Sequence, residues 1–188
     1  MVVVSEHGPE ILDEYARIPI RFQVKEYFQV QWKDGGLGGM ELVLREVDPP
    51  FIKDHDRSDP VIYWKRDFDL SNWVFLMAEE DGEKVGAAAI AYDTKGVHML
   101  QGRKDITVLW DIRVSPEYRG GGVGSALFTH AAEWSRKKNC RLMKVETQNI
   151  NVPACRFYAK QGCYLGSIDI HAYPKFENEV CLMWYLPL

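Results

Sequence analysis

The sequence predicts an α/β fold around a mixed, mainly antiparallel sheet, and three patterns support this prediction. An apolar run at residues 109–114 enters a glycine-rich turn, after which apolar residues recur at helical spacing. A second strand-like run, at residues 142–147, also leads into a helical stretch. Residues 73–79 and 85–92 flank an Asp-Gly pair and are typical of a β-hairpin. Helices that alternate with strands, together with a hairpin, indicate this fold class.

The N-terminal quarter of the chain has weaker patterns. The apolar spacing within residues 9–17 predicts a short helix. Residues 22–32 have the aromatic and β-branched content of a strand or a docked arm. The glycines of residues 34–39 predict a turn, and residues 40–47 predict the strand that follows it.

The two helices of the C-terminal half have recognisable boundaries. The first is predicted to run from Val123 to Trp134 and to be followed by basic residues, which suit the C-terminal end of a helix. Asn151 is a good N-cap for the second helix, and Gly162 suits its end. Residues 180–186 predict a final strand that closes the sheet.

Composition indicates a compact enzyme. The chain has 188 residues, 46% of them hydrophobic, so we expect one domain over residues 1–188, with residues 1–40 as a candidate N-terminal arm. The net charge of −4 argues against nucleic acid as a partner. No apolar stretch is long enough to cross a membrane, so the sequence predicts a cytoplasmic protein without a membrane partner. The four cysteines lack paired spacing, which favours buried thiols over disulfides or a metal site.

The turn after residues 109–114 has the composition of a phosphate-binding site. Glycines lack a Cβ and reach positive φ, so consecutive backbone amides can converge on one anion. A helix that starts here adds its unpaired first-turn amides, and Arg119 adds a cation. A nucleotide P-loop does not fit, because Gly124 is followed by Ser125-Ala126 and not by a Lys-Ser or Lys-Thr pair. The dinucleotide pattern GxGxxG does not fit either, because Ser125 replaces its third glycine.

Two motifs give the chain a specific family resemblance. Residues 119–124 match the pattern R/Q-x-x-G-x-G/A, and residues 151–162 resemble N-x-x-A-x-x-(F/L)-Y-x-x-x-G. In this order and on these predicted elements, they resemble the signatures of the GNAT family of N-acetyltransferases, which use acetyl-CoA. The resemblance extends to one branch of the family, the streptothricin acetyltransferases. It covers most of the chain from about Ile20 onward, but little of residues 93–104.

The resemblance implies a GNAT fold, in which two central strands splay apart and hold the coenzyme between them. Backbone amides of Ile112 and Val114 would then hold the thioester oxygen and the pantetheine arm, while amides of the glycine-rich turn would hold the pyrophosphate. No metal is expected. The implied acetyl-CoA-binding residues are Ile112, Arg113, Val114, Arg119, Gly120, Gly121, Gly122, Val123, Gly124, Ser125, Asn151 and Tyr158.

The reaction requires a base for the amine proton, a site for the oxyanion and an acid for the departing thiolate. Tyr158, seven residues after Asn151, occupies the position of the family's general acid. Glu146 could accept the amine proton directly or through water. Asp111 is its rival, although it could instead hold a cationic acceptor. The residues alone do not rank these two carboxylates.

The resemblance implies an N-acetyltransferase that modifies a primary amine of a small cationic acceptor, with streptothricin, an antibiotic, as the first candidate. The negative net charge suits such an acceptor. Alternatives are acetylation of a protein N-terminus or of another amine metabolite, and a non-catalytic acetyl-CoA-binding module. The chain could form a homodimer. Part of an acidic cluster could line the acceptor pocket: Asp54, Asp56, Asp59, Asp67 and Asp69.

Overall fold

The computed structural model describes residues 1–176 and 178–188, which form two compact units. The first unit contains Met1–Arg21, Asp54–Val145 and Tyr185–Leu188, and the second contains Phe22–Lys53 and Glu146–Trp184. The residues expected to form an N-terminal arm, 1–40, are therefore divided between the two units. One domain over the whole chain stays a prediction.

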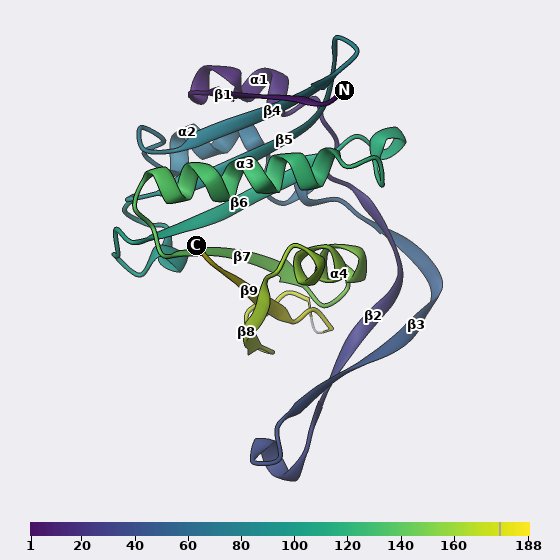
Figure 1. The fold of residues 1–188 in the computed structure, drawn as a ribbon. Coiled ribbons are helices and arrows are strands. Elements are labelled where there is room, and N and C mark those ends of the chain that lie inside the picture. Colours follow the sequence, from purple (N-terminus) through teal and green to yellow (C-terminus); the bar gives the residue numbers. More distant parts are fainter. Residues whose placement is uncertain (177) are drawn as a thin grey trace. The chain divides into compact units, whose positions relative to one another are not determined.

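The first unit is built on a sheet with the strand order β1-β4-β5-β6-β7 (Figure 1). The neighbours from β1 to β6 are antiparallel, and β6 pairs with β7 in parallel. This confirms the predicted α/β class with a mixed, mainly antiparallel sheet. The strands are β1 (Val3–His7), β4 (Val74–Glu80), β5 (Glu83–Tyr92), β6 (Ile106–Val114) and β7 (Leu142–Gln148).

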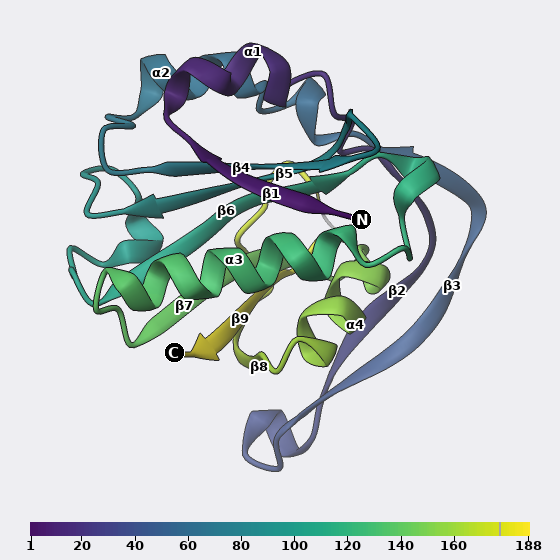
Figure 2. The ribbon, with the colours of Figure 1, turned by 45° about the horizontal axis from the view of Figure 1, so that its top comes forward.

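Helices cover both faces of this sheet (Figure 2). The short helices α1 (Leu12–Tyr15) and α2 (Trp64–Asp67) lie on one face, and α3 (Val123–Lys137) lies on the other. Short 3₁₀ helices connect the elements: Pro9–Ile11, Asp34–Gly36, His55–Arg57, Val61–Tyr63, His98–Leu100 and Pro116–Tyr118. The helix predicted within residues 9–17 and the long helix after the glycine-rich turn are both confirmed.

Small residues on β5 let α3 approach the sheet closely. A Cβ added to Gly86 would lie 2.7 Å from Cγ1 of Val123, the first residue of α3. Gly86 therefore fixes the height of the N-terminal end of α3 above the sheet. On the opposite face, α1 and α2 enclose an aromatic core that includes Tyr15, Trp64, Trp73, Phe75 and Trp110.

The predicted hairpin between β4 and β5 is confirmed, and its turn uses the expected residues. Asp81 and Gly82 both have positive φ, of 52° and 84°. This is the backbone twist that a two-residue hairpin turn requires, and Asp-Gly adopts it at low cost. No strand was predicted at Val3–His7. This segment forms β1 and pairs with β4 along its whole length.

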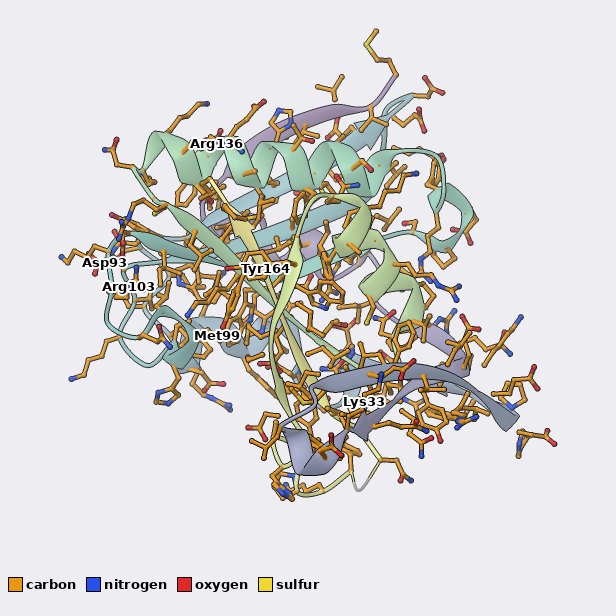
Figure 3. The ribbon with its side chains drawn as sticks, turned by 60° about the horizontal axis from the view of Figure 1, so that its bottom comes forward. Lys33, Asp93, Met99, Arg103, Arg136 and Tyr164 are labelled. Atoms are coloured by element: carbon orange, nitrogen blue, oxygen red, sulfur yellow. The ribbon has the colours of Figure 1, made fainter. Side chains whose placement is uncertain are left out.

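The segment between β5 and β6, residues 93–105, packs against the rest of the first unit. Figure 3 shows Asp93, Met99 and Arg103 at the same end of that unit. The carbonyl oxygen of Met99 accepts a hydrogen bond of 2.9 Å from Nζ of the buried Lys144. This contact ties the segment to β7.

The second unit combines a long hairpin with the C-terminal elements. In the hairpin, β2 (Phe22–Trp32) pairs with β3 (Met40–Lys53) in antiparallel orientation, and β3 extends six residues beyond the predicted strand 40–47. The other elements are the end of β7, α4 (Val152–Lys160), β8 (Tyr164–Asp169) and the first four residues of β9 (Cys181–Pro187), and the strand order is β7-β9-β8. All four cysteines are free and buried, as predicted. No helix in the described part of the chain is both long enough and apolar enough to cross a lipid bilayer.

Candidate active site

The glycine-rich turn between β6 and α3 has an open backbone. Gly120 and Gly122 have φ of 84° and 94°, and a Cβ added at either position would meet nothing within 4 Å. Gly122 is the N-cap of α3, and no side chain caps the helix there. The turn thus presents main-chain groups and a helix N-terminus, which together favour an anion.

Arg119 holds this turn against the end of β6. Its Nε donates to the carbonyl oxygen of Val114 at 2.9 Å, and its Nη2 donates to that of Arg21 at 3.0 Å. The guanidinium thus spans two carbonyl groups, which fixes the shape of the turn. The expected role of Arg119 as a cation beside the amides stays a prediction.

The side of β6 that faces away from β5 carries the backbone amides of Ile112 and Val114, which are expected to contact the coenzyme. The amide of Ser115 donates to the carbonyl of Val85 on the β5 side, at 2.8 Å. Because amides alternate in direction along an antiparallel strand, those of Ile112 and Val114 point away from β5. The carbonyl of Val114 points the same way, since it accepts from Arg119. Pairing of β6 with β7 ends at Leu109, so these amides lie beyond the paired segment.

A β-bulge sets the side-chain directions near this edge. Leu109 pairs with Ile90 and Asp111 pairs with Ala89, which leaves Trp110 as the extra residue of β6. The bulge turns Asp111 and the residue two further on, Arg113, toward the face covered by α1 and α2, because Ala89 lies in the core on that face. The amide of Arg113 points toward β5 by the same alternation. Its expected contact with the coenzyme stays a prediction, without support from this geometry.

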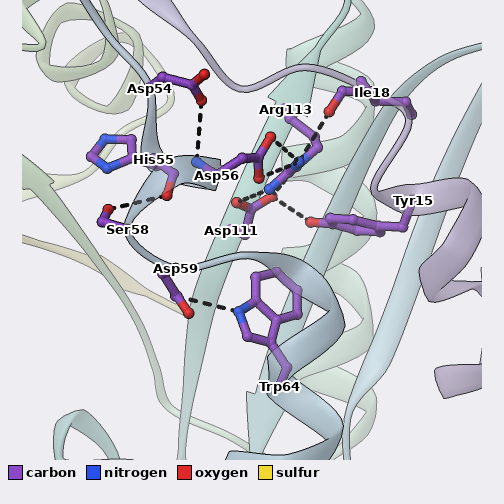
Figure 4. Close-up of polar contacts among 10 residues, drawn as sticks. All are labelled: Tyr15, Ile18, Asp54, His55, Asp56, Ser58, Asp59, Trp64, Asp111 and Arg113. Carbon is purple, nitrogen blue, oxygen red and sulfur yellow. Dashed lines mark hydrogen bonds and ion pairs between the residues drawn. The ribbon is translucent and has the colours of Figure 1, made fainter.

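Asp111 and Arg113 form a buried ion pair (Figure 4). The guanidinium binds both carboxylate oxygens, with Nε 2.8 Å from Oδ1 and Nη2 2.9 Å from Oδ2. The side chains are 1% exposed for Arg113 and 7% for Asp111. Tyr15 donates its hydroxyl to Oδ1 of Asp111 at 2.5 Å. Both oxygens of Asp111 are therefore engaged.

The surroundings of Tyr15 and Arg113 keep the first protonated and the second charged. Burial and the neighbouring Asp111 raise the pKa of Tyr15 far above its usual value, so Tyr15 remains a donor. Burial lowers the pKa of Arg113, but Asp111, Tyr15 and Asp56 together raise it further than burial lowers it. Arg113 is therefore charged at every working pH.

Arg113 also binds the loop that carries part of the acidic cluster. Its Nη1 donates to the carbonyl of Ile18 at 3.0 Å and lies 3.2 Å from Oδ1 of Asp56. Within this loop, Asp54 accepts from the amide of Asp56, and Asp59 accepts from the indole N–H of Trp64. The last two members of the predicted acidic cluster lie elsewhere with local partners: Asp67 pairs with Arg66, and Asp69 accepts from the amide of Ser71.

Glu146 lies on β7 in the second unit and has a neutral partner. The hydroxyl of Tyr173 donates to Oε1 of Glu146 at 2.6 Å. Gln148 donates from Nε2 to the same hydroxyl at 3.1 Å. The carboxylate is half-buried and is bound through one oxygen by a phenol, whereas Asp111 is bound through both oxygens by a guanidinium.

Asn151 and Tyr158 occupy the two ends of α4. The side chain of Asn151 accepts from the amide of Ala154 at 3.2 Å, which confirms the predicted N-cap. Tyr158 is 4% exposed, and its ring packs against Phe157 and Trp184, with centroids 5.4 and 6.4 Å away. Their expected contacts with the coenzyme stay predictions.

The structure brings the predicted residues together in two groups. The first unit holds Asp111, Ile112, Val114 and the glycine-rich turn, and the second holds Glu146, Asn151 and Tyr158. The partners Tyr15 and Tyr173 were not predicted, nor was the side-chain role of Arg113. Nothing in the local pattern marks the two tyrosines, because their partners lie 96 and 27 positions away. Arg113 stands two positions after its partner Asp111, a spacing that places both side chains on one face of a strand.

Comparison with known proteins adds a direct observation. The profile of the acetyltransferase (GNAT) family matches residues 40–163, which include the glycine-rich turn and α4. This chain belongs to the GNAT acetyltransferase family. Its members are acetyl-CoA-dependent N-acetyltransferases, so the predicted family and enzyme class are confirmed.

Relatives within the family share most of the chain. It is 45% identical over 139 residues to streptothricin acetyltransferase A of Bacillus subtilis (strain 168), covering 72% of this chain and 73% of the relative. It is 31% identical over 186 residues to streptothricin acetyltransferase of Escherichia coli, covering 97% and 92%. A solved structure of a candidate streptothricin acetyltransferase from Bacillus anthracis str. Ames, in complex with acetyl coenzyme A, has a TM-score of 0.77 at 24% identity and covers 100% and 98%. That structure supports the GNAT fold.

Proposed function

We propose that this chain acetylates a primary amine of streptothricin, with acetyl-CoA as the donor. The observation that supports this most is the similarity to two streptothricin acetyltransferases, at 45% and 31% identity over 72% and 97% of the chain. The negative net charge suits a cationic acceptor. The acceptor is a small molecule, and modification of its amine would inactivate the antibiotic.

The residues of the glycine-rich turn fit a diphosphate. Gly120 and Gly122 supply positive φ and leave open space where a side chain would stand, and α3 presents an N-terminus without a side-chain cap. Amides of Gly120, Gly122, Val123, Gly124 and Ser125 would hold the pyrophosphate, with Arg119 fixing the turn through its two hydrogen bonds. The Gly121 amide donates to the carbonyl of Tyr118 at 3.3 Å, so it supports the shape of the turn. When bound, acetyl-CoA supplies an activated acetyl group as a thioester.

The edge amides of β6 would hold the carbonyl end of the donor. Ile112 and Val114 direct their N–H groups away from β5, as required of donors that stabilise a developing oxyanion. Backbone donors keep their position when side chains change, because the sheet holds them. Ile112 is our assignment for the oxyanion donor.

Two side chains would move the protons. Glu146 would accept the proton of the attacking amine, and Tyr158 would return a proton to the thiolate, since a phenol with a pKa near 10 is protonated at neutral pH. Asp111 is the weaker candidate for the base, because an Arg113 guanidinium engages both of its oxygens. We assign Asp111 a structural role on β6, as the buried partner of Arg113.

The experiment is to incubate the protein with acetyl-CoA and streptothricin and to follow the drug by mass spectrometry. We expect a product heavier by one acetyl group, together with release of one free thiol per product. Initial rates at several concentrations of both substrates should give intersecting double-reciprocal lines, as direct attack in a ternary complex requires. Unmodified drug at high enzyme concentration would exclude streptothricin as the acceptor.

The alternatives give different results in the same assay. A peptide that begins with a free alanine amine and a panel of polyamines test the protein N-terminus and other metabolites. Binding of acetyl-CoA in calorimetry without thiol release on any amine would indicate a binding module. The ratio of kcat/KM values across the panel decides among the acceptors.

A further inference from the structure

We propose that Tyr173 is a positioning residue that aims the Glu146 carboxylate for proton transfer. This inference rests on the proposed function, in which Glu146 accepts the amine proton. It assigns a role to a residue of the loop between β8 and β9, which none of the family motifs includes. The geometry around the Tyr173 hydroxyl supports it.

The hydroxyl of Tyr173 is oriented by its neighbours. Gln148 donates to it from Nε2 at 3.1 Å, and an amide N–H can be met only by a lone pair. The hydroxyl proton is therefore free to be donated, and Oε1 of Glu146 lies 2.6 Å away. The Cys181 thiol also interacts with both Tyr173 and Glu146. Glu146 and Gln148 stand two positions apart on β7, so their side chains lie on the same face of the strand, toward Tyr173.

The loop that carries Tyr173 is anchored near its C-terminal end, at Glu179 and Val180. Val180 exchanges two hydrogen bonds with Asn149: its amide donates to Oδ1 at 2.8 Å, and its carbonyl accepts from the Asn149 amide at 3.0 Å. Glu179 pairs with Lys53 at 2.5 Å, and their side chains are only 11% and 13% exposed. A donor on a held loop fixes the direction of the carboxylate that it binds.

The groups that face Glu146 are neutral near neutral pH. Burial, followed by Glu146 itself, raises the pKa of Tyr173 far above its usual value. Burial raises the pKa of the Cys181 thiol to about 12, and Glu146 adds to this shift. Asp169 is the other carboxylate that acts on Cys181. Tyr173 and Cys181 are therefore neutral neighbours of Glu146.

A hydrogen bond from a neutral hydroxyl holds a carboxylate in one direction without forming an ion pair. Tyr173 binds Glu146 in this way, whereas Asp111 is held by the charged Arg113. Because the carboxylate is planar, holding Oε1 also sets the direction of Oε2. Glu146 is thus aimed, and a general base must first lie within reach of the proton that it accepts.

The test is the steady-state kinetics of Tyr173→Phe with acetyl-CoA and streptothricin. We expect kcat to fall about tenfold, because the carboxylate is no longer held in one direction. The KM for acetyl-CoA should not change. Tyr63→Phe is the matched control, because it removes the hydroxyl of an exposed tyrosine whose ring packs on Arg66 in the first unit.

Two further variants guard against a folding defect. Gln148→Met removes the donor that orients the Tyr173 hydroxyl and should lower kcat by a smaller factor. The double variant Glu146→Gln with Tyr173→Phe should lose no more activity than Glu146→Gln alone, because Tyr173 acts through Glu146. An unchanged kcat in Tyr173→Phe, or a double variant that loses more activity than Glu146→Gln alone, would overturn the inference.

A second readout separates this inference from the proposed function. Crystal structures of the wild type and of Tyr173→Phe need no turnover. A Glu146 carboxylate that changes direction in the variant supports positioning by Tyr173, and an unmoved carboxylate contradicts it. If the wild type makes no acetylated streptothricin, the proposed function fails, while the two structures still decide the contact.

Discussion

Asp111 and Glu146 are both carboxylates on central strands, one in each unit, and their surroundings differ in the charge of the partner. Asp111 is bound at both oxygens by a buried guanidinium, with a tyrosine as a third donor. Glu146 is bound at one oxygen by a neutral tyrosine. A cationic partner makes the carboxylate part of a buried ion pair, which is costly to break from either side. A neutral donor positions a carboxylate without pairing it with a charge.

The largest effect should come from removing the base. Glu146→Gln keeps the shape of the side chain and the contact with Tyr173, but it cannot accept a proton. We expect kcat to fall about a thousandfold, within the range of general-base catalysis, and the affinity for acetyl-CoA to stay unchanged. Steady-state kinetics and calorimetry measure the two quantities. A kcat within tenfold of the wild type would transfer the role of base to another group.

Substitution of Asp111, the carboxylate bound by Arg113, should affect stability more than turnover. Asp111→Asn leaves the buried Arg113 without its bidentate partner, so we expect the free energy of unfolding to fall by about 3 kcal/mol. Urea unfolding followed by tryptophan fluorescence measures this change. The control is Asp105→Asn, which removes an exposed carboxylate that also pairs with two arginines, Arg103 and Arg141, and should change stability much less. Equal stability for both variants would contradict the structural role of Asp111.

A substitution in the glycine-rich turn should lower the affinity for acetyl-CoA. Gly122→Ala places a Cβ at a φ of 94°, which costs about 1 kcal/mol of backbone strain, and displaces the amides that follow. We expect acetyl-CoA binding to weaken about tenfold in calorimetry. Gly102→Ala is a matched control, because Gly102 also has positive φ and open space around it but lies outside the turn. A similar loss of affinity in both variants would mean that strain alone is responsible.

The smallest expected effect is on the stability of the Asp59→Asn variant, and it depends on pH. Burial raises the pKa of Asp59. As pH rises, the unfolded chain therefore ionises first, and the wild type loses stability through the range of ordinary Asp titration and up to the raised value. Asp59→Asn removes this penalty and should gain a few tenths of a kcal/mol at neutral pH, with no gain at low pH where both states are protonated. Thermal unfolding across this pH range measures the difference, and a constant gain at all pH values would contradict it.

Local pattern was sufficient for most elements of the fold. The hairpin turn, the glycine-rich turn, the two long helices and the N-cap Asn151 each depend on neighbours within a few residues, so they could be predicted. The strand Val3–His7 was missed, because its partner β4 lies about 70 residues further along the chain. The extension of β3 to Lys53 was missed because Pro49 and Pro50 suggest an end. The two prolines lie where the ladder is interrupted, between the pairs Glu26–Glu46 and Val24–Phe51, and a bulge tolerates proline.

The motifs located the chemistry but did not distinguish its carboxylates. Asp111 and Glu146 were equivalent candidates in the sequence, and the bulge at Trp110 together with the partner Arg113 separates them. Likewise, Arg119 was expected to serve as a cation, and the structure gives it two carbonyl groups to hold.

By itself the sequence determined the family, the glycine-rich turn, the helix that follows it and the identities of the candidate acids and bases. These depend on backbone preferences and on short-range spacing, which neighbouring residues specify. Only the tertiary structure decided which carboxylate is paired with a cation and which with a phenol. The two phenol contacts join residues 96 and 27 positions apart. Asp111 and Arg113 are only two positions apart, but the bulge at Trp110 and the surrounding core decide that both side chains point to the same buried face. A partner's charge and burial take effect only when folding brings the two groups into contact.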